Sequence, residues 1–232
     1  ASELAATGTS VIRTTELGEG DEDKLIAPAD NILAKATAAV TDKTGTTSAN
    51  KNNWGALFDG KVAGVNCTND DANVAIINGE RWAEGQPFSS MYFSFTFTGH
   101  YVFDSLLLGG DNDTAYGIIN PRVYIGDESI AEVIANGTQP VWSYSGVVGA
   151  GMLVDLSQER LVGTTLIIQS DTKGNGSWTY VHASELAATG RTTAVKTRQE
   201  TIVCVGDSIT YGTVFNNVDT WSASRLENHY PL

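Results

Sequence analysis

The sequence predicts an all-β domain, a sandwich or barrel of antiparallel strands, on three observations. Residues 91–98 (MYFSFTFT) alternate Phe with Tyr, Ser and Thr, which is the two-residue period of a strand with one buried face. Residues 161–169 (LVGTTLIIQ) are rich in β-branched residues, which favour strands. Turn-forming pairs such as Asn78-Gly79 and Gly126-Asp127 recur between such runs, and no segment shows a long helical period.

An exact repeat marks the ends of this β-domain. Residues 1–8 read ASELAATG, and residues 183–190 read ASELAATG again. Because the second copy continues a strand-like run at residues 177–182 (SWTYVH), we interpret each copy as the closing strand of a repeated domain. The chain is then expected to begin in the closing strand of a preceding repeat and to contain one whole β-module at residues 31–190.

Polar stretches separate this module from its neighbours. The linker expected at residues 9–30 contains ELGEGDED, an acidic run with glycine that favours a solvated, extended connection. A second short polar linker is expected at residues 191–199 (RTTAVKTRQ). Residues 200–232 then begin with an apolar run, and we interpret them as the truncated start of another domain.

Composition restricts the partners of the chain. The formal charge of −13 would repel phosphate backbones and anionic lipid, so we expect no nucleic acid, and no apolar run is long enough for membrane insertion. The two cysteines, Cys67 and Cys204, fall in different modules, which argues against a disulfide framework and a cysteine metal site. Neutral glycans, divalent cations and neighbouring repeats of the same protein remain as partners, and the polar surface favours an extracellular, bacterial protein.

Four segments of residues 31–190 occur in an order that resembles the discoidin-type (coagulation factor 5/8 type C) jelly roll. They are NILAK at 31–35, LFDG at 57–60, the aromatic strand at 91–97 and SEL at 184–186. The resemblance implies a discoidin-like jelly-roll β-sandwich. Bacterial carbohydrate-binding modules share that fold, so the resemblance also implies a polysaccharide or glycan as the partner.

The same resemblance implies a structural Ca²⁺. In the family, the Asp-Gly turn and the Glu of the final strand hold the ion between the chain ends, and those residues are here Asp59 and Glu185. Asn66, Thr68 and Asp70 lie close to the turn in sequence and could add oxygen ligands, which Ca²⁺ prefers. The alternative is an ordinary turn in which Asp59 caps its own backbone.

Aromatic residues beside loops are the candidates for glycan binding, because sugars stack on exposed rings while Asn, Asp and Arg bond their hydroxyls. The candidate set is Trp54, Asn112, Asp113, Tyr116, Arg122, Trp142, Tyr144 and Trp178. Trp178, in the loop GNGSW, and Tyr116 are favoured as the stacking rings. For any one of these rings, packing in the core is the alternative role.

The C-terminal residues carry a second resemblance. The apolar strand at 201–205 (TIVCV) runs into Gly206-Asp207-Ser208, followed by Ile-Thr-Tyr-Gly. This pattern resembles the first block of SGNH (GDSL-type) hydrolases, which implies Ser208 beside Asp207 as the nucleophile of a parent enzyme. The Asn and Asp-His blocks of that family do not follow, so we expect a strand-turn-helix fragment of a truncated α/β hydrolase that is inactive in this chain.

Together these features predict a non-catalytic carbohydrate-binding module of a secreted, polysaccharide-acting esterase. One alternative is an SGNH-type carbohydrate esterase, in which Ser208 hydrolyses acyl esters once another chain supplies the missing base. The other alternative is a structural or adhesive cell-surface repeat that binds no sugar.

Overall fold

The computed structural model describes residues 12–42, 50–70, 72–78, 90–111, 116–174 and 179–193. The chain divides into two compact units, Ala1–Thr193 and Ala194–Leu232, and every described residue lies in the first unit. The expected closing strand at 1–8 and the expected hydrolase fragment at 200–232, with Asp207 and Ser208, lie outside the described residues.

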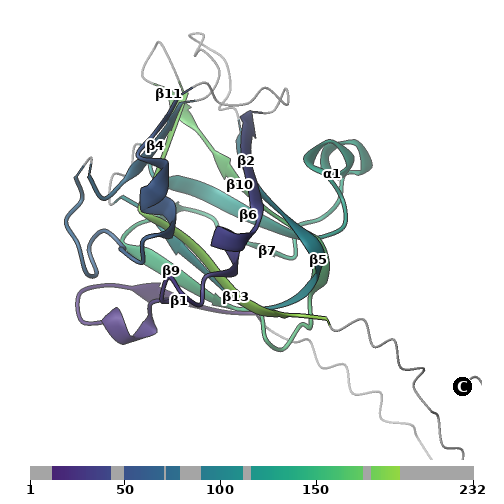
Figure 1. The fold of residues 1–232 in the computed structure, drawn as a ribbon. Coiled ribbons are helices and arrows are strands. Elements are labelled where there is room, and N and C mark those ends of the chain that lie inside the picture. Colours follow the sequence, from purple (N-terminus) through teal and green to yellow (C-terminus); the bar gives the residue numbers. More distant parts are fainter. Residues whose placement is uncertain are drawn as a thin grey trace, which may run out of the picture. The chain divides into compact units, whose positions relative to one another are not determined.

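Within the described residues, the strands form two sheets whose pairings are all antiparallel (Figure 1). The larger sheet contains β1 (Arg13–Leu17), β2 (Thr37–Asp42), β5 (Ser90–Gly109), β6 (Ile118–Gly126), β7 (Trp142–Ser143), β8 (Val147–Val148), β9 (Gly151–Asp155), β10 (Val162–Asp171) and β13 (Glu185–Thr192). The smaller sheet contains β3 (Asn50–Asn52), β4 (Ala75–Asn78), β11 (Lys173–Gly174) and β12 (Thr179–Ala183). This arrangement confirms the predicted all-β jelly-roll sandwich.

The alternating aromatic run places the core. Phe93, Phe95 and Phe97 are buried on the inner face of β5, where they join one apolar cluster with Ile77 and Val181 of the smaller sheet. Successive strand side chains point to opposite faces, so this run can line the core with every second residue. β5 is one strand of 20 residues, which pairs with β2 and β10 along its first half and with β13 and β9 along its second half.

The expected linker at 9–30 is partly wrong, because it contains β1. This strand pairs with β9 along its whole length, from Arg13 opposite Asp155 to Leu17 opposite Gly151. Its first four residues are exposed, which is why the sequence looks like a solvated linker, but Leu17 is buried against Val62 and Leu107. Backbone pairing and one apolar anchor are enough to hold a polar strand at a sheet edge.

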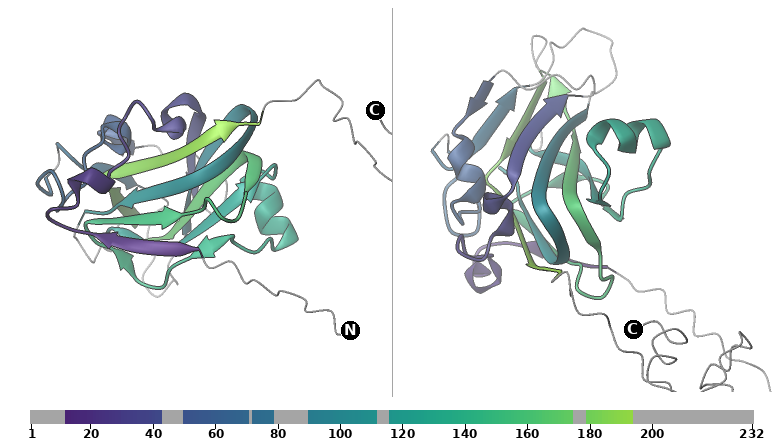
Figure 2. Two further views of the ribbon diagram at one scale, coloured as in Figure 1. Left: turned by 90° about the horizontal axis from the view of Figure 1, so that it is seen from below. Right: turned by 45° about the vertical axis from the view of Figure 1, so that its right-hand side comes forward.

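Four helical segments connect the strands in the described residues. They are the 3-10 turns η1 (Glu22–Lys24), η2 (Ile32–Lys35) and η3 (Trp54–Phe58), and the α-helix α1 (Ile130–Asn136). α1 was not expected from the sequence. It lies on the side of the larger sheet that faces away from β3 and β4 (Figure 2).

The second copy of the repeated octapeptide forms the end of β12 and most of β13. β13 pairs with β5 from Glu185 opposite Gly109 to Thr192 opposite Tyr101. The strand therefore runs past residue 190, the end of the expected module, into the first two residues of the expected linker at 191–199.

Candidate functional site

One end of the smaller sheet gathers aromatic side chains from segments distant in sequence. Tyr180 and His182 are two positions apart on β12, so their side chains point to the same face. Tyr116 lies in the turn before β6, and the backbone N–H of His182 donates to the Tyr116 carbonyl at 2.7 Å. That bond brings the turn beside β12. We call Tyr116, Tyr180, His182 and Asp111 the ring cluster.

The three rings of the cluster contact one another. The ring centroid of Tyr116 is 5.7 Å from that of Tyr180 in an edge-to-face arrangement, and 5.2 Å from that of His182. The ring centroids of Tyr180 and His182 are 6.2 Å apart, and these two rings are also edge to face. Both tyrosines are half-buried. A partly exposed aromatic group of this kind can stack on the apolar face of a sugar.

Asp111 fixes the histidine of the cluster. His182 Nδ1 lies 2.8 Å from Asp111 Oδ2, and the side chain of Asp111 is 3% exposed. A carboxylate can only accept, so the hydrogen of this bond lies on Nδ1 of His182. Asp111 lies two residues after the end of β5 and immediately precedes the segment 112–115 in sequence. The cluster therefore offers a histidine of fixed orientation next to two phenol rings.

The sequence-predicted glycan residues are only partly placed. Tyr116 belongs to the ring cluster, and the segments 112–115 and 175–178 adjoin the cluster residues in sequence. The predicted Asn112, Asp113 and Trp178 lie in those segments, outside the described residues. Sequence reasoning missed Tyr180 and His182, although the strand run TYVHA could have indicated two rings on one face.

Three predicted aromatic residues are held in packing contacts instead. Trp142 is 8% exposed within the main core, and its Nε1–H donates to Thr14 Oγ1 at 3.1 Å. Tyr144 is half-buried, and its hydroxyl lies 3.0 Å from Glu16 Oε1, an acceptor that raises the phenol's pKa. Trp54 packs edge to face on Phe58, with a centroid distance of 5.8 Å.

Trp142 offers no exposed face for a sugar, because the core covers its ring. A loop-adjacent Trp in the sequence was therefore a core residue, which is the alternative that the sequence left open. Trp54 and Tyr144 keep partial exposure beside these contacts.

Arg122 lies on the outer face of the larger sheet and not in the ring cluster. Its Nη1 donates to Asp171 Oδ1 at 2.9 Å, and this bond raises the pKa of the guanidinium. Arg122 borders a hollow of about 450 Å³ together with Tyr92, Tyr124 and Gln169. The Tyr124 hydroxyl donates to Gln169 Oε1 at 2.9 Å, so these polar side chains are already bonded to one another.

Two of the predicted calcium ligands come together. Glu185 begins β13 and is fully buried, while Asp59 immediately follows η3 and begins the turn there. Glu185 Oε2 accepts the N–H of Gly60 at 2.8 Å, and its Oε1 accepts the side-chain amide of Asn31 at 3.3 Å. Burial, with a further contribution from the nearby Asp59 carboxylate, raises the pKa of Glu185 to about 9.

Asn66, Thr68 and Asp70 do not extend this pair into a cluster of free oxygens. Asn66 accepts the N–H of Val62 at 2.8 Å and donates to the Gly60 carbonyl at 3.1 Å, so it braces the turn. Thr68 and Asp70 bond each other at 2.7 Å in a separate turn. In the described part of the chain, no group of three or more His, Cys, Asp or Glu side chains is arranged for a metal. A cation at Asp59 and Glu185 would need backbone carbonyls to complete its shell.

No protein-family model matches the chain, and no curated protein matches it by sequence. Among solved structures, it is similar to a fucolectin from striped bass (Morone saxatilis) serum, with a TM-score of 0.49 and 12% identity. That match covers 70% of this chain and 49% of the fucolectin, so the chain spans about half the length of that protein.

Two Clostridium perfringens modules are also similar. One is a family 32 carbohydrate-binding module from a family 31 glycoside hydrolase, with a TM-score of 0.42, 10% identity, and coverage of 75% of this chain and 100% of the module. The other is a family 32 module solved in complex with galactose, with a TM-score of 0.43, 10% identity, and coverage of 67% and 94%. Within the described residues, no helix is long and apolar enough to cross a membrane.

Proposed function

We propose that the β-sandwich is a non-catalytic glycan-binding module and that the ring cluster is its binding site. The observation that carries the proposal is the grouping of Tyr116, Tyr180 and His182, with the histidine oriented by Asp111 at 2.8 Å. Rings would stack on a sugar face, and His182 would bond a sugar hydroxyl. The sequence-predicted Asn112, Asp113 and Trp178 belong to the segments that adjoin Asp111, Tyr116 and Thr179 in sequence.

The test is a glycan array with the full chain, followed by titration calorimetry with the best ligand. Tyr180→Ala and His182→Ala should each weaken binding about fivefold, since an aromatic contact or a hydrogen bond is worth roughly 1 kcal/mol. Tyr144→Phe is the matched control, because it changes a tyrosine bonded to Glu16 outside the cluster and should bind as the parent does. A silent array would favour the structural or adhesive repeat, and unaltered binding by both cluster variants would move the site elsewhere.

We further propose that the module serves a secreted enzyme that removes acyl groups from polysaccharide. The support is the Gly206-Asp207-Ser208 block, in which Ser208 would be the nucleophile. Because a serine needs a base and oxyanion donors held beside it, the present chain should hydrolyse p-nitrophenyl acetate no faster than its Ser208→Ala variant. Turnover above that variant would favour the alternative, an esterase whose base comes from elsewhere.

We also propose that Asp59 and Glu185 hold a structural Ca²⁺. The support is the fully buried Glu185 beside Asp59, where ionisation of Glu185 is costly without a compensating cation, as its raised pKa indicates. The ion would tie the turn after η3 to β13 and would take no part in chemistry.

A further inference from the structure

The outer face of the larger sheet is built from matched rows of side chains. Strands β2, β5, β10 and β6 lie side by side, and the register places three rows across them. Each row is given in the strand order β2, β5, β10 and β6. The first row is Thr37, Thr96 and Thr165, the middle row is Ala39, Ser94, Ile167 and Tyr124, and the third row is Thr41, Tyr92, Gln169 and Arg122. In the middle row the side chains are large on β6 and β10 and small on β5 and β2.

Helix α1 covers only that end of the middle row where the side chains are large, on β10 and β6. Val133 packs with Tyr92 and Ile167 in a small apolar cluster, which holds the helix over β10. Over Ser94 no bulky side chain fills the space between the helix and the sheet. The result is a cleft of about 750 Å³, within the usual size range of small-molecule sites. We call it the α1 cleft.

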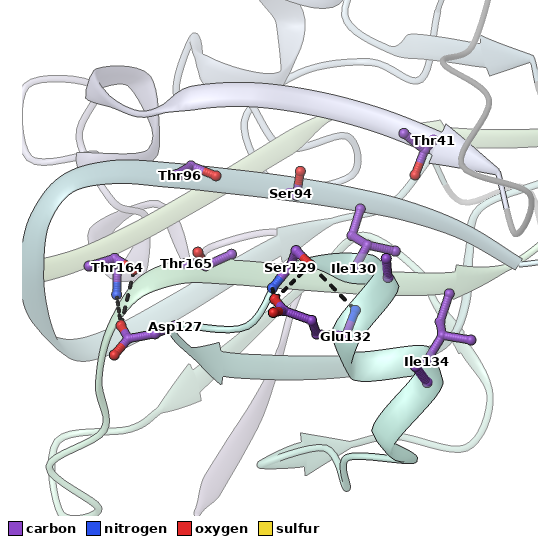
Figure 3. Close-up of a pocket in the computed structure, with 12 residues that line it drawn as sticks. Thr41, Ser94, Thr96, Asp127, Ser129, Ile130, Glu132, Ile134, Thr164 and Thr165 are labelled. Atoms are coloured by element: carbon purple, nitrogen blue, oxygen red, sulfur yellow. Dashed lines mark hydrogen bonds between the residues drawn. The ribbon is translucent and has the colours of Figure 1, made fainter.

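The two sides of the α1 cleft have different chemistry, as Figure 3 shows. The helix contributes Ile130 and Ile134, which are one turn apart and so project from the same side. Ile134 is 48% exposed, the largest exposure among the large apolar side chains that the structure describes. The strands contribute the hydroxyls of Ser94, Thr96 and Thr165. A ligand in the cleft would meet methyl groups on one side and hydroxyls on the other.

Thr41 adds a hydroxyl without a hydrogen-bond partner to the strand side of the α1 cleft. Its Oγ1 is buried and has no hydrogen-bond partner in the described structure, the only side-chain atom there with that property. A buried hydroxyl without a partner raises the free energy of the folded state. A hydroxyl or carbonyl group of a ligand beside Thr41 is a suitable partner after rotation of the side chain.

The charges around the α1 cleft exclude an anion. Asp127 and Glu132 are the charged groups among its described lining residues, and both are carboxylates. Each already accepts hydrogen bonds: Asp127 from Thr164 at 3.0 Å, and Glu132 from the backbone N–H of Ser129 at 2.8 Å. Among the described lining residues, fatty-acid carboxylates and phosphates would meet repulsion and no counter-charge.

We propose that the α1 cleft is a second binding site, for an uncharged sugar that carries an apolar substituent such as an acyl or alkyl chain. The substituent lies against Ile130 and Ile134, and the sugar hydroxyls bond the Ser and Thr hydroxyls of the sheet. The site shares no residue with the ring cluster, so it does not depend on the function proposed above.

Titration calorimetry with hexyl β-D-glucoside, below its micelle concentration, tests this site. The full chain should bind it at least tenfold more tightly than methyl β-D-glucoside, because each buried methylene adds about fourfold in affinity. Hexanoate should not bind measurably, and hexylammonium should bind more weakly than the glucoside. Equal affinity for the hexyl and methyl glucosides, or a preference for either charged probe, would overturn the proposal.

Two variants locate the binding. Ser94→Leu fills the floor of the cleft and Ile134→Asp places a charge on its apolar side, and each should weaken hexyl glucoside binding at least tenfold. Val162→Asp is the control, because Val162 is similarly exposed at 44% but lies outside the cleft. Since Ser94→Leu alters a core strand, the exposed Ile134→Asp variant decides the outcome if Ser94→Leu melts early. Normal binding by Ile134→Asp, or a matching loss in Val162→Asp or in His182→Ala, would refute this site while leaving the ring cluster to its own test.

Discussion

Glu185 places a carboxylate at the centre of the contact between β13, the turn after η3 and the segment before η2. Its oxygens accept from the N–H of Gly60 at 2.8 Å and from the Asn31 amide at 3.3 Å. The Asn31 amide also donates to the Leu186 carbonyl at 3.0 Å, and its oxygen accepts the Leu33 N–H at 3.0 Å. With its pKa raised to about 9, Glu185 is protonated near pH 7 in the absence of a cation, and the proposed Ca²⁺ would stabilise its charged form.

We predict that EDTA lowers the melting temperature of the full chain and that added CaCl₂ restores it. An ion that binds only the folded state adds RT ln(1 + [L]/Kd), about 2.7 kcal/mol at a hundredfold excess over Kd. In Asp59→Ala the melting temperature should no longer respond to EDTA. Differential scanning calorimetry of both proteins, each with EDTA and with CaCl₂, measures the response.

Asp70→Ala is the matched control for the calcium prediction. It removes an acidic residue from the neighbouring turn, where Asp70 bonds Thr68 at 2.7 Å, so it should leave the EDTA response intact. A parent chain that melts identically with EDTA and with calcium would contradict the ion site. Loss of the EDTA response in Asp70→Ala would place the ion in the turn that contains Thr68 and Asp70.

At the residue scale, sequence patterns did not distinguish a half-buried aromatic side chain from one in the core. Tyr116 lies in the ring cluster, as a loop-adjacent aromatic can, but Trp142 is in the core. The two differ in tertiary environment, which their neighbours in sequence do not reveal. A backbone hydrogen bond from His182 to Tyr116 brings β12 beside a turn more than sixty residues earlier, a contact that no local pattern encodes.

At the scale of elements, long periodic segments were predictable and short ones were not. The aromatic run of β5 was clear because eight alternating residues establish its period. α1 has seven residues, fewer than two full turns, so it shows no period. Its ends were nevertheless encoded: Ser129 and Glu132 form a capping box, and Gly137 ends the helix at a φ of 62°.

We predict that Gly163→Ala disrupts the pairing of β10 with β6, whereas Gly126→Ala is tolerated. A Cβ added at Gly163 would lie 2.3 Å from the Gly126 carbonyl oxygen, while one added at Gly126 meets nothing within 4 Å. Overpacking against backbone should cost at least about 2 kcal/mol, since the strands must separate locally. Urea denaturation followed by tryptophan fluorescence compares the two variants.

These two glycines form a matched pair because they lie on opposite strands at the same contact. Gly163 precedes the irregularity in the β10–β5 register, and Gly126 pairs with Thr165. If both variants unfold at the parent's urea midpoint, the close approach of the two strands is not a constraint on the fold. If Gly126→Ala were the more destabilising change, the close approach would lie on the side of Gly126 and not of Gly163, contrary to the prediction.

At the scale of the whole molecule, the sandwich begins before the module that the sequence outlined. Thr14 accepts the indole N–H of Trp142 at 3.1 Å, and Glu16 bonds the hydroxyl of Tyr144 at 3.0 Å. β1 therefore joins the segment around β7 as well as β9. The sequence indicated a linker at residues 9–30 because exposed strands and extended linkers have the same polar composition.

The last prediction concerns the extent of the folded unit: a fragment of residues 31–190 should be less stable than one of residues 12–193. The shorter fragment loses the pairing of β1 with β9 and the last residues of β13. It also exposes the surface that Leu17 covers and leaves Trp142 Nε1 without Thr14. One buried leucine and one buried hydrogen bond together amount to about 3 kcal/mol. Urea denaturation monitored by circular dichroism should show the lower midpoint, and Leu17→Ala in the full chain should reproduce part of the loss. Equal midpoints for the two fragments would mean that β1 rests on the sheet without stabilising it.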